Sequence, residues 1–308
     1  VHDLPLVGTM VGVAARLKIP IVADLHENYP AALQVYDIHP LLKKTIFNYR
    51  RWKRYEAGVL SQVDHILVVV EESKEYLLAE HLPADRITLV PNATPPEFAN
   101  SAMDARILAR YHDNFVISYI GSFGPHRGID VAIRAMARIR ATIPSARLVL
   151  VGSRSKPFES RMQSMAADLG FSDVVEFVPW QPYSVLPSYI QASDVCLLPL
   201  NPGLHTHASG PHKLFQYWML GKPVIVSSCR SLKRIMEEAG GGLIFEAGEP
   251  DDLARCIQTL HDDPGLGEKL GARGREAALS GSYGWNKTAE RLNQVYANLT
   301  DKWYREHQ

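Results

Sequence analysis

Two segments of the sequence combine glycines, the start of a helix and one cation, which is the composition of an anion-binding site. The first is the run ISYIGSFGPHRG at residues 117–128, where an apolar strand leads through a glycine-containing loop into a helix. Such a loop turns backbone amides toward the carboxyl end of the strand, where phosphates bind. Arg127 adds a planar guanidinium that can hold two phosphate oxygens. A tight turn with a solvated arginine is the alternative, and these residues alone leave both open.

The second segment is the run SGPHKLFQYWMLGKPVI at residues 209–225. Gly210 predicts the N-cap of a helix and Pro211 its first residue. Lys213 then lies in the first turn, where a cation is unfavourable beside the helix dipole unless an anion offsets it. A local conflict of this kind indicates function rather than stability. The alternative for Lys213 is a surface lysine whose stem lies along the protein.

Histidines accompany these segments. His205, His207 and His212 could bind zinc, but no carboxylate or thiolate accompanies them and their spacing straddles a turn, so we expect no metal site. His207 and His212 are better interpreted as contacts to a diphosphate or an acceptor. Near the start of the chain, His26 and Glu27 follow a predicted strand at the edge where open sheets form sites. We predict that both border an acceptor; capping or solvated side chains are the alternative.

The elements that must position these residues are short β-branched runs that alternate with helical patterns. Helical spacing is clear at residues 129–142, 159–169 and 251–261. Buried strands separated by helices predict parallel sheets with both faces covered. The predicted strands are residues 19–23, 66–70, 87–90, 116–120, 148–151, 174–177, 195–198, 224–227 and 242–245.

Three prolines within residues 91–96 form the clearest boundary, because proline stops helices and central strands. We therefore predict an N-terminal domain over residues 1–94, a second domain over 95–284 and a final helix over 285–308. Only three strand signals precede the boundary, which predicts that strands are missing upstream and that the first domain is incomplete at its start.

The composition is that of an ordinary globular protein, with 46% hydrophobic and 21% charged residues among 308. The formal net charge is zero, so no global field attracts nucleic acid. The three cysteines are far apart, and no apolar stretch approaches the roughly 20 residues of a membrane span. These features predict a cytoplasmic protein. Because no G-x-G-x-x-G run follows a strand, a dinucleotide-dependent oxidoreductase is not expected.

Residues 43–54 predict a basic helix that also carries aromatic side chains. Such a helix can lie on an anionic membrane, here the inner face, as a peripheral contact. It can equally pack its aromatic side in the core and leave its basic face in solvent, which the regular helical spacing favours. Its cations are Lys43, Lys44, Arg50, Arg51, Lys53 and Arg54.

An ordered series of motifs resembles the family 4 retaining glycosyltransferases, the glycosyl transferases group 1, which have the GT-B fold. The helix and strand at residues 211–225 are similar to the signature helix of this family, and the match covers nearly the whole chain. The other similar segments, in family order, are residues 64–70, 90–92, 120–128, 148–152, 177–180, 193–195 and 242–245.

The resemblance implies an α/β protein of two facing Rossmann-like domains with doubly wound parallel sheets, an active site in the cleft between them, and a final helix that crosses back to the first domain. It also implies sugar transfer from a UDP or GDP type of nucleotide sugar to an acceptor hydroxyl, with retention and without a cofactor or metal. The acceptor would be a glycan, a lipid-linked molecule or a small molecule, as in polysaccharide biosynthesis.

The resemblance also implies roles for single residues. Arg127 and Lys213 would neutralise the donor diphosphate, and His2 would lie near the transferred sugar. The phosphates, nucleoside and base would be met by a donor set that comprises Gly121, Ser122, Gly128, Gly152, Ser153, Pro179, Trp180, Ser209, Gly210, Pro211, His212, Leu214 and Gln216.

The sequence departs from the family at three positions. Ala208 and Gln216 stand where the family has two glutamates separated by seven residues, and Ser122 replaces a frequent arginine. An amide bonds the ribose hydroxyls more weakly than a carboxylate does. Two alternatives therefore stay open: a nucleotide-binding or scaffolding homologue without catalysis, and a sugar-nucleotide epimerase, against which the replaced glutamates argue.

Overall fold

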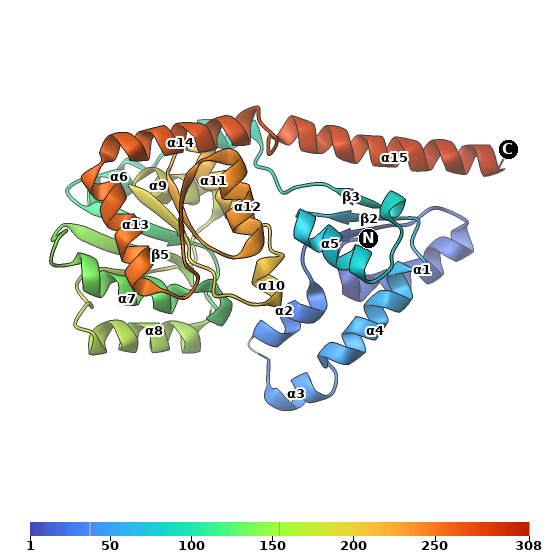
Figure 1. The fold of residues 1–308 in the computed structure, drawn as a ribbon, viewed down its shortest axis with the longest axis horizontal. Helices are drawn as coiled ribbons and strands as arrows, with labels where there is room; N and C mark the ends of the chain where they lie inside the picture. The colour runs from blue at the N-terminus through green and yellow to red at the C-terminus, as the bar shows by residue number, and fades with distance from the viewer. Residues whose placement is uncertain (37, 154, 308) are drawn as a thin grey trace. The chain divides into compact units, whose positions relative to one another are not determined.

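The computed structural model describes residues 1–36, 38–153 and 155–307, and the chain folds into two compact units (Figure 1). The first unit comprises residues 1–92, residues 203–210 and the chain from Asn286 onward; the second comprises residues 93–202 and 211–285. Residues 203–210 therefore group with the first unit, whereas the sequence predicted them in the second domain. Gln308, the end of the predicted final helix, lies outside the described residues.

The first unit contains a parallel sheet with the order β1-β2-β3. Its first strand begins three residues later than predicted, because Ile19 lies exposed beyond the first helix and Pro20 has no amide proton for a ladder. The helices α1 (Leu4–Leu17), α4 (Tyr49–Leu60) and α5 (Glu71–Ala79) contribute to its core. The remaining elements are β1 (Val22–Leu25), α2 (Tyr29–Val35), α3 (Pro40–Lys44), β2 (His65–Val68), β3 (Ile87–Leu89) and α10 (Leu204–His207).

The last helix, α15 (Trp285–His307), packs with this first sheet. Val295 is buried in one cluster with Val22 of β1 and Leu67 of β2. Farther along, the Trp303 indole donates a hydrogen bond of 2.6 Å to the carbonyl oxygen of Lys18. The final helix thus belongs to the first unit from Asn286 onward.

The second unit contains a parallel sheet of six strands with the order β6-β5-β4-β7-β8-β9. The chain order reverses between β4 and β7, and the carboxyl edge at such a switch point is where open α/β sheets bind ligands. The strands are β4 (Phe115–Ile120), β5 (Ala146–Ser153), β6 (Val175–Pro179), β7 (Val195–Leu198), β8 (Val224–Ser227) and β9 (Gly242–Phe245). The helices are α6 (Ala105–Tyr111), α7 (Ile129–Ile139), α8 (Lys156–Asp168), α9 (Leu186–Gln191), α11 (His212–Met219), α12 (Arg230–Ala239), α13 (Pro250–Asp262) and α14 (Pro264–Leu279).

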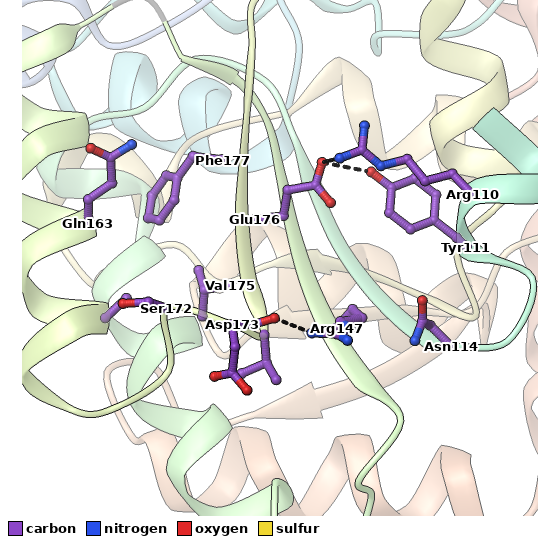
Figure 2. A pocket seen from close by; sticks show the side chains of 12 residues that line it. Arg110, Tyr111, Asn114, Arg147, Gln163, Ser172, Asp173, Val175, Glu176 and Phe177 are labelled. Carbon is purple, nitrogen blue, oxygen red and sulfur yellow. Dashed lines mark hydrogen bonds and ion pairs between the residues drawn. The ribbon is translucent and has the colours of Figure 1, made fainter. Parts of the chain in front are cut away.

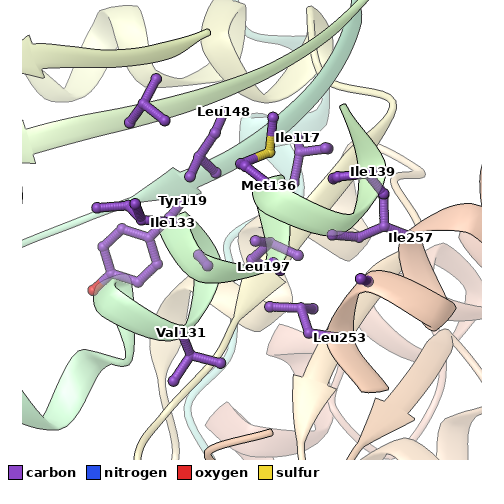
Figure 3. Close-up of a cluster of buried hydrophobic side chains, with 14 of the residues drawn as sticks. Ile117, Tyr119, Val131, Ile133, Met136, Ile139, Leu148, Leu197, Leu253 and Ile257 are labelled. Carbon is purple, nitrogen blue, oxygen red and sulfur yellow. The ribbon is translucent and has the colours of Figure 1, made fainter. Parts of the chain in front are cut away.

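A continuous apolar core fixes the two central strands of this sheet. Figure 3 shows Ile133 of α7 and Leu253 of α13 meeting Ile117 of β4 and Leu197 of β7, all fully buried. Burying each such side chain stabilises the unit by about 1.5–3 kcal/mol. The ends of β4 and β7, where the switch point lies, are therefore held on a rigid base.

A search of the described helices finds none with the length and apolar character that crossing a membrane requires.

Candidate functional site

The loops at the switch point approach each other so closely that only glycine fits. Gly128 follows the short helix η3 (Pro125–Arg127) with φ 65°, and a Cβ there would lie 1.6 Å from the carbonyl oxygen of Pro199, just after β7. A Cβ on Gly152 of β5, which has φ 108°, would lie 3.0 Å from the carbonyl oxygen of Gly121. The end of β5 and the loops that follow β4 and β7 are thereby packed backbone to backbone.

Gly121 also makes room for a cation. Its φ is 145°, and a Cβ there would lie 2.2 Å from Nζ of Lys213. Lys213 comes from the first turn of α11, which begins at His212 and has Pro211 as its N-cap, one residue later than predicted. Pro211 has ψ 119°, so it is extended rather than helical. The shift keeps Lys213 beside the helix N-terminus, where the sequence placed it.

The ammonium of Lys213 is held by a tyrosine that the sequence analysis did not single out. Nζ donates a hydrogen bond of 3.0 Å to the hydroxyl of Tyr119 and lies 4.5 Å from the centre of its ring. The same hydroxyl donates to the carbonyl oxygen of Ser122 at 2.9 Å. Burial raises the pKa of Tyr119 to about 12, so it keeps its proton at neutral pH. Tyr119 therefore joins the lysine to the loop after β4.

A second tyrosine hydroxyl fixes α11 to the end of β4. The backbone amide of Ile120 donates to the hydroxyl of Tyr217 at 2.9 Å, and this hydroxyl donates to the Ile120 carbonyl oxygen at 3.3 Å. Tyr217 is fully buried. Its only signal in the sequence is its place in the signature helix.

The electrostatics of this edge of the sheet favour an anion. Burial and the positive charge of Arg127 hold the pKa of Lys213 well below its usual 10.5, and no acidic group among the described residues offsets them. Nε of Arg127 is buried and has no hydrogen-bond partner within the described part of the chain. The amides of His212 and Lys213, the first two of α11, have no carbonyl partner within the helix. Two neighbouring cations and a helix N-terminus thus surround a position without a counter-charge.

One turn farther along α11, the predicted ribose contact has an unexpected neighbour. Gln216 is buried, and its amide nitrogen donates to the hydroxyl of Tyr183 at 3.1 Å. The Tyr183 ring is 55% exposed and Trp180 is 51% exposed, so both can contact a base. The sequence analysis predicted a base contact at Trp180 and did not name Tyr183, which lies in a short 3-10 helix without a motif.

The remaining predicted donor residues of this unit differ in their accessibility. Leu214 is fully buried and its amide bonds the carbonyl oxygen of Pro211, so its side chain belongs to the core. His212 makes a 3.0 Å hydrogen bond through Nε2 with the carbonyl oxygen of Ala93, and burial lowers its pKa. The hydroxyl of Ser153 is buried and has no partner among the residues that the structure describes. Pro179 ends β6 with an exposed side chain.

In the first unit, the predicted His2 and His26 meet at Asp24, which the sequence analysis did not single out. His2 pairs with Asp24 as an isolated parallel bridge, and its Nδ1 lies 2.9 Å from the Asp24 carboxylate. Nε2 of His26 lies 3.3 Å from the same oxygen, and its Nδ1 lies 3.4 Å from Asp3. The hydrogen bond to Asp24 raises the pKa of His26, although burial opposes it. Burial raises the pKa of Asp24, but the hydrogen bond and charge of His26 outweigh it and lower that pKa overall.

This group offers two nitrogens and one carboxylate oxygen that all lie within 4.8 Å of one another. Such a set can share protons or hold a divalent cation. In the described residues it is the one cluster of metal-ligand types, and His205, His207 and His212 do not form another.

Glu27, predicted to border the acceptor, is engaged within the first unit. Its carboxylate accepts from the Tyr36 hydroxyl at 2.6 and 2.8 Å, and Nε2 of His205 lies at 3.9 Å. Ser209 is buried and its hydroxyl donates to the His205 carbonyl oxygen at 2.8 Å. Ser209 and Gly210, both predicted as donor contacts, thus belong to the first unit together with α10.

A cavity of about 490 Å³ lies at the opposite, amino edge of the six-stranded sheet (Figure 2). The two arginines that line it already have partners. Arg110 forms an ion pair with Glu176 at 2.7 Å, and the Arg147 guanidinium donates a hydrogen bond to the Asp173 carbonyl oxygen. Figure 2 also shows the hydroxyl of Tyr111 on the same Glu176. The unneutralised charge at the carboxyl edge, rather than this cavity, therefore identifies the candidate site.

Comparison with known families matches both parts of the chain. The sequence pattern of the glycosyl transferases group 1 matches residues 101–277, and that of glycosyltransferase family 4 matches residues 1–98. The predicted family is therefore confirmed.

Individual relatives are more distant. A D-inositol 3-phosphate glycosyltransferase of Acidothermus cellulolyticus is 30% identical over 253 residues, which are 78% of this chain and 54% of the relative. The chain spans about half the length of the curated relatives it matches, between 42% and 59% of four such enzymes.

Solved structures match nearly the whole chain. Sucrose-phosphate synthase from Thermosynechococcus elongatus has a TM-score of 0.79 at 22% identity and covers 98% of this chain and 73% of its own. Anabaena HepE in complex with UDP has a TM-score of 0.78 at 15% identity and covers 97% and 78%. At these identities the likeness shows the fold, and the GT-B fold of two Rossmann-like domains is confirmed.

Proposed function

We propose, since the chain belongs to the glycosyl transferases group 1 family, that it transfers a sugar from a nucleoside diphosphate to an acceptor hydroxyl with retention at the anomeric carbon. The observation that carries the proposal is the pair of cations, Arg127 and Lys213, at the switch point of the second unit. Burial and the charge of Arg127 disfavour the ammonium of Lys213 unless an anion binds, and a diphosphate is an anion that α/β folds of this kind bind at such an edge.

In the proposed reaction, negative charge develops on the leaving diphosphate as the bond to the sugar breaks. Arg127, Lys213 and the first amides of α11 would stabilise that charge more strongly in the transition state than in the bound donor. Tyr119 would keep the ammonium in position through its 3.0 Å hydrogen bond. Because two fixed cations supply the charge, the proposed step takes no divalent metal at the diphosphate.

The nucleoside would lie beside Gln216, one turn along α11 from Lys213. The amide of Gln216 and the hydroxyl of Tyr183 would meet the ribose, and the exposed rings of Tyr183 and Trp180 would contact the base. UDP is the first nucleotide to test, because the similar fold of Anabaena HepE is described in complex with UDP. GDP stays the alternative of the same class.

For the acceptor we propose a glycan, a lipid-linked molecule or a small molecule, met by His2, His26 and Glu27 of the first unit. The name of the Acidothermus cellulolyticus relative, a D-inositol 3-phosphate glycosyltransferase, supports a hydroxyl-rich acceptor. Cys196 and Cys256 are buried free cysteines, which supports a reducing, cytoplasmic location.

One observation favours a second candidate, a nucleotide-binding homologue without turnover. Ala208 takes the place of the first family glutamate and is buried, and its carbonyl oxygen accepts from the Ser73 hydroxyl. Gln216 takes the place of the second, and its amide is bonded to Tyr183. Both replacements are thus integrated in the packing, so a donor could bind without the carboxylates that the family uses.

The test is a titration of UDP, GDP and ADP, in the presence of a chelator, into the parent chain and into R127A/K213A. Losing two charged contacts should cost at least about 3 kcal/mol, roughly a hundredfold in affinity. The matched control is R161A/K269A, which removes two exposed cations from the same unit. Equal loss in both variants, or no binding of any nucleotide by the parent, would contradict the donor site.

A further inference from the structure

One short segment concentrates positive charge in a chain that is neutral as a whole. The formal net charge of all 308 residues is zero, yet residues 38–55 contain six lysines and arginines and no aspartate or glutamate. These residues form α3, the turn after it and the first half of α4. The proposed donor site uses none of them.

The structure separates the two sides of α4. Its aromatic side faces inward: Trp52 and Tyr55 pack against the core of the first unit, and the Trp52 ring centre lies 4.8 Å from that of Tyr29. The Trp52 indole also donates to the Ile46 carbonyl oxygen at 2.9 Å, which ties the turn to the helix. The aromatic residues are therefore structural, as the helical spacing indicated.

The outward side of α4 carries Arg50, Arg51 and Arg54, and Lys44 lies just before it on α3; all four are exposed. In the described part of the chain none of the four has an ion pair. Lys53 differs, since it is paired with Glu80 at 2.8 Å. This side of the helix thus offers free cations to a partner.

Aliphatic side chains stand beside these cations without any cover. Leu41 is 65% exposed, Leu42 41% and Ile46 56%, and α3 buries none of its residues. Figure 1 shows α3 at the tip of the first unit's helices, where α2 and α4 converge and away from the sheet. We call the seven residues Leu41, Leu42, Lys44, Ile46, Arg50, Arg51 and Arg54 the α3–α4 surface.

We propose that the α3–α4 surface docks the protein on a membrane that contains anionic phospholipid. Aliphatic side chains on a surface helix enter the boundary between headgroups and acyl chains, and neighbouring cations bind the negative headgroups. A bilayer satisfies both features at once. A polyanion such as RNA would satisfy the four cations and leave the three aliphatic residues in water, so it accounts for only half of the surface.

Docking goes beyond the proposed sugar transfer and does not depend on it. One consequence does rest on that function: a docked enzyme would favour the lipid-linked class of acceptor over a free small molecule. Vesicle binding without any nucleotide and nucleotide binding without any vesicle test the two proposals separately.

The experiment measures sedimentation of the whole chain with vesicles of phosphatidylcholine alone or with about one-third phosphatidylglycerol. The variants are L41S/I46S, which removes exposed apolar area, and R50A/R54A, which removes exposed charge. Their controls are L78S/L169S, at residues that are 36% and 38% exposed, and R161A/K269A. All substitutions fall on exposed side chains, and circular dichroism checks that each variant is folded.

We expect binding to anionic vesicles only, which weakens as NaCl rises from about 0.05 M to about 0.5 M because the Debye length shortens. Each surface variant should lower the partition coefficient at least about tenfold, while the controls stay within about twofold. Absent or equal binding to both vesicle types would overturn the proposal, and so would surface variants that bind like their controls. Loss of vesicle binding in R50A/R54A alone, while L41S/I46S binds anionic vesicles as its control does, would overturn it in favour of a polyanion.

Discussion

Replacing Lys213 by methionine should separate a functional lysine from a structural one. In the free protein the ammonium is partly buried beside Arg127, and its pKa is held well below 10.5. Desolvating a charge costs several kcal/mol in proteins. Against this, the substitution removes one hydrogen bond to Tyr119, which contributes about 1 kcal/mol. Tyr119 keeps its own bond to the Ser122 carbonyl oxygen, so its hydroxyl is not left without a partner.

The difference predicts that K213M is more stable than the parent chain by about 1–2 kcal/mol when no nucleotide is present. For a unit of this size that raises the melting temperature by ~2–8 °C. A saturating nucleoside diphosphate should raise the melting temperature of the parent and leave that of K213M unchanged, because ligand that binds the folded state stabilises it.

The assay is thermal unfolding, followed by circular dichroism, of the parent, K213M and K269M, with and without each nucleotide. K269M removes an exposed lysine of the same unit and should behave like the parent. A K213M that melts below the parent without ligand would refute the reasoning, since Lys213 would then stabilise the fold rather than await an anion.

Three further outcomes follow from the structure. At pH values above the lowered pKa of Lys213, nucleotide binding should take up protons, and the affinity for the nucleotide should fall as the pH rises. Calorimetry in buffers of different ionisation enthalpy measures the proton uptake. Equal binding heats in all buffers would contradict it. G128A should lower the free energy of unfolding of the second unit, measured in urea, by about 3 kcal/mol or more, because Gly128 has φ 65° and a Cβ there would meet the Pro199 carbonyl oxygen. The control G170A, at a residue with φ 77° and open space around it, should cost only about 1 kcal/mol. Equal losses in the two variants would count against the packing described. Because the pKa of His26 is raised, its contribution to stability is complete below about pH 6.5 and is lost as the pH rises through the raised value. The difference in melting temperature between the parent and H26N should therefore shrink over that pH window. A constant difference would exclude the pairing of His26 with Asp24.

The strands and the position of Lys213 in its helix were accessible from the sequence because their signals are local. The runs 195–198 and 224–227 coincide with β7 and β8, since strands buried on both faces are continuous apolar segments. The run 242–245 coincides with β9, a partly buried strand at the edge of the sheet. Lys213 was accessible because a cation in the first turn of a helix is a conflict that the sequence itself displays. Gly221, with φ 70°, follows the C-cap residue Leu220 of α11, which is a usual place for glycine after a helix.

The residues that escaped prediction act through distant neighbours. Tyr119 looks like any aromatic residue in a buried strand until the fold brings α11, 94 residues later, within 3.0 Å of its hydroxyl. Asp24 and Tyr183 likewise gain their roles from His2, His26 and Gln216, to which no spacing rule connects them. The grouping of residues 203–210 with the first unit also depends on tertiary packing of α10 with α2.

The exposed aliphatic residues of the α3–α4 surface also could not be identified from the sequence. Helical spacing in residues 43–54 favoured an inward aromatic side and a basic face in solvent, but it did not show which aliphatic residues beside that face stay uncovered. The structure turns Trp52 inward and leaves Leu41 and Ile46 exposed. Tertiary packing thus selects the residues that are free to meet a partner.

The most direct test of the central claim is a crystal structure of the chain with the nucleoside diphosphate that binds it most tightly. We predict diphosphate oxygens at about 2.7–2.9 Å from both Nζ of Lys213 and the guanidinium of Arg127, at the carboxyl edge of β4. A diphosphate bound elsewhere, for example in the cavity of Arg110 and Arg147 at the amino edge of the same sheet, would contradict the account.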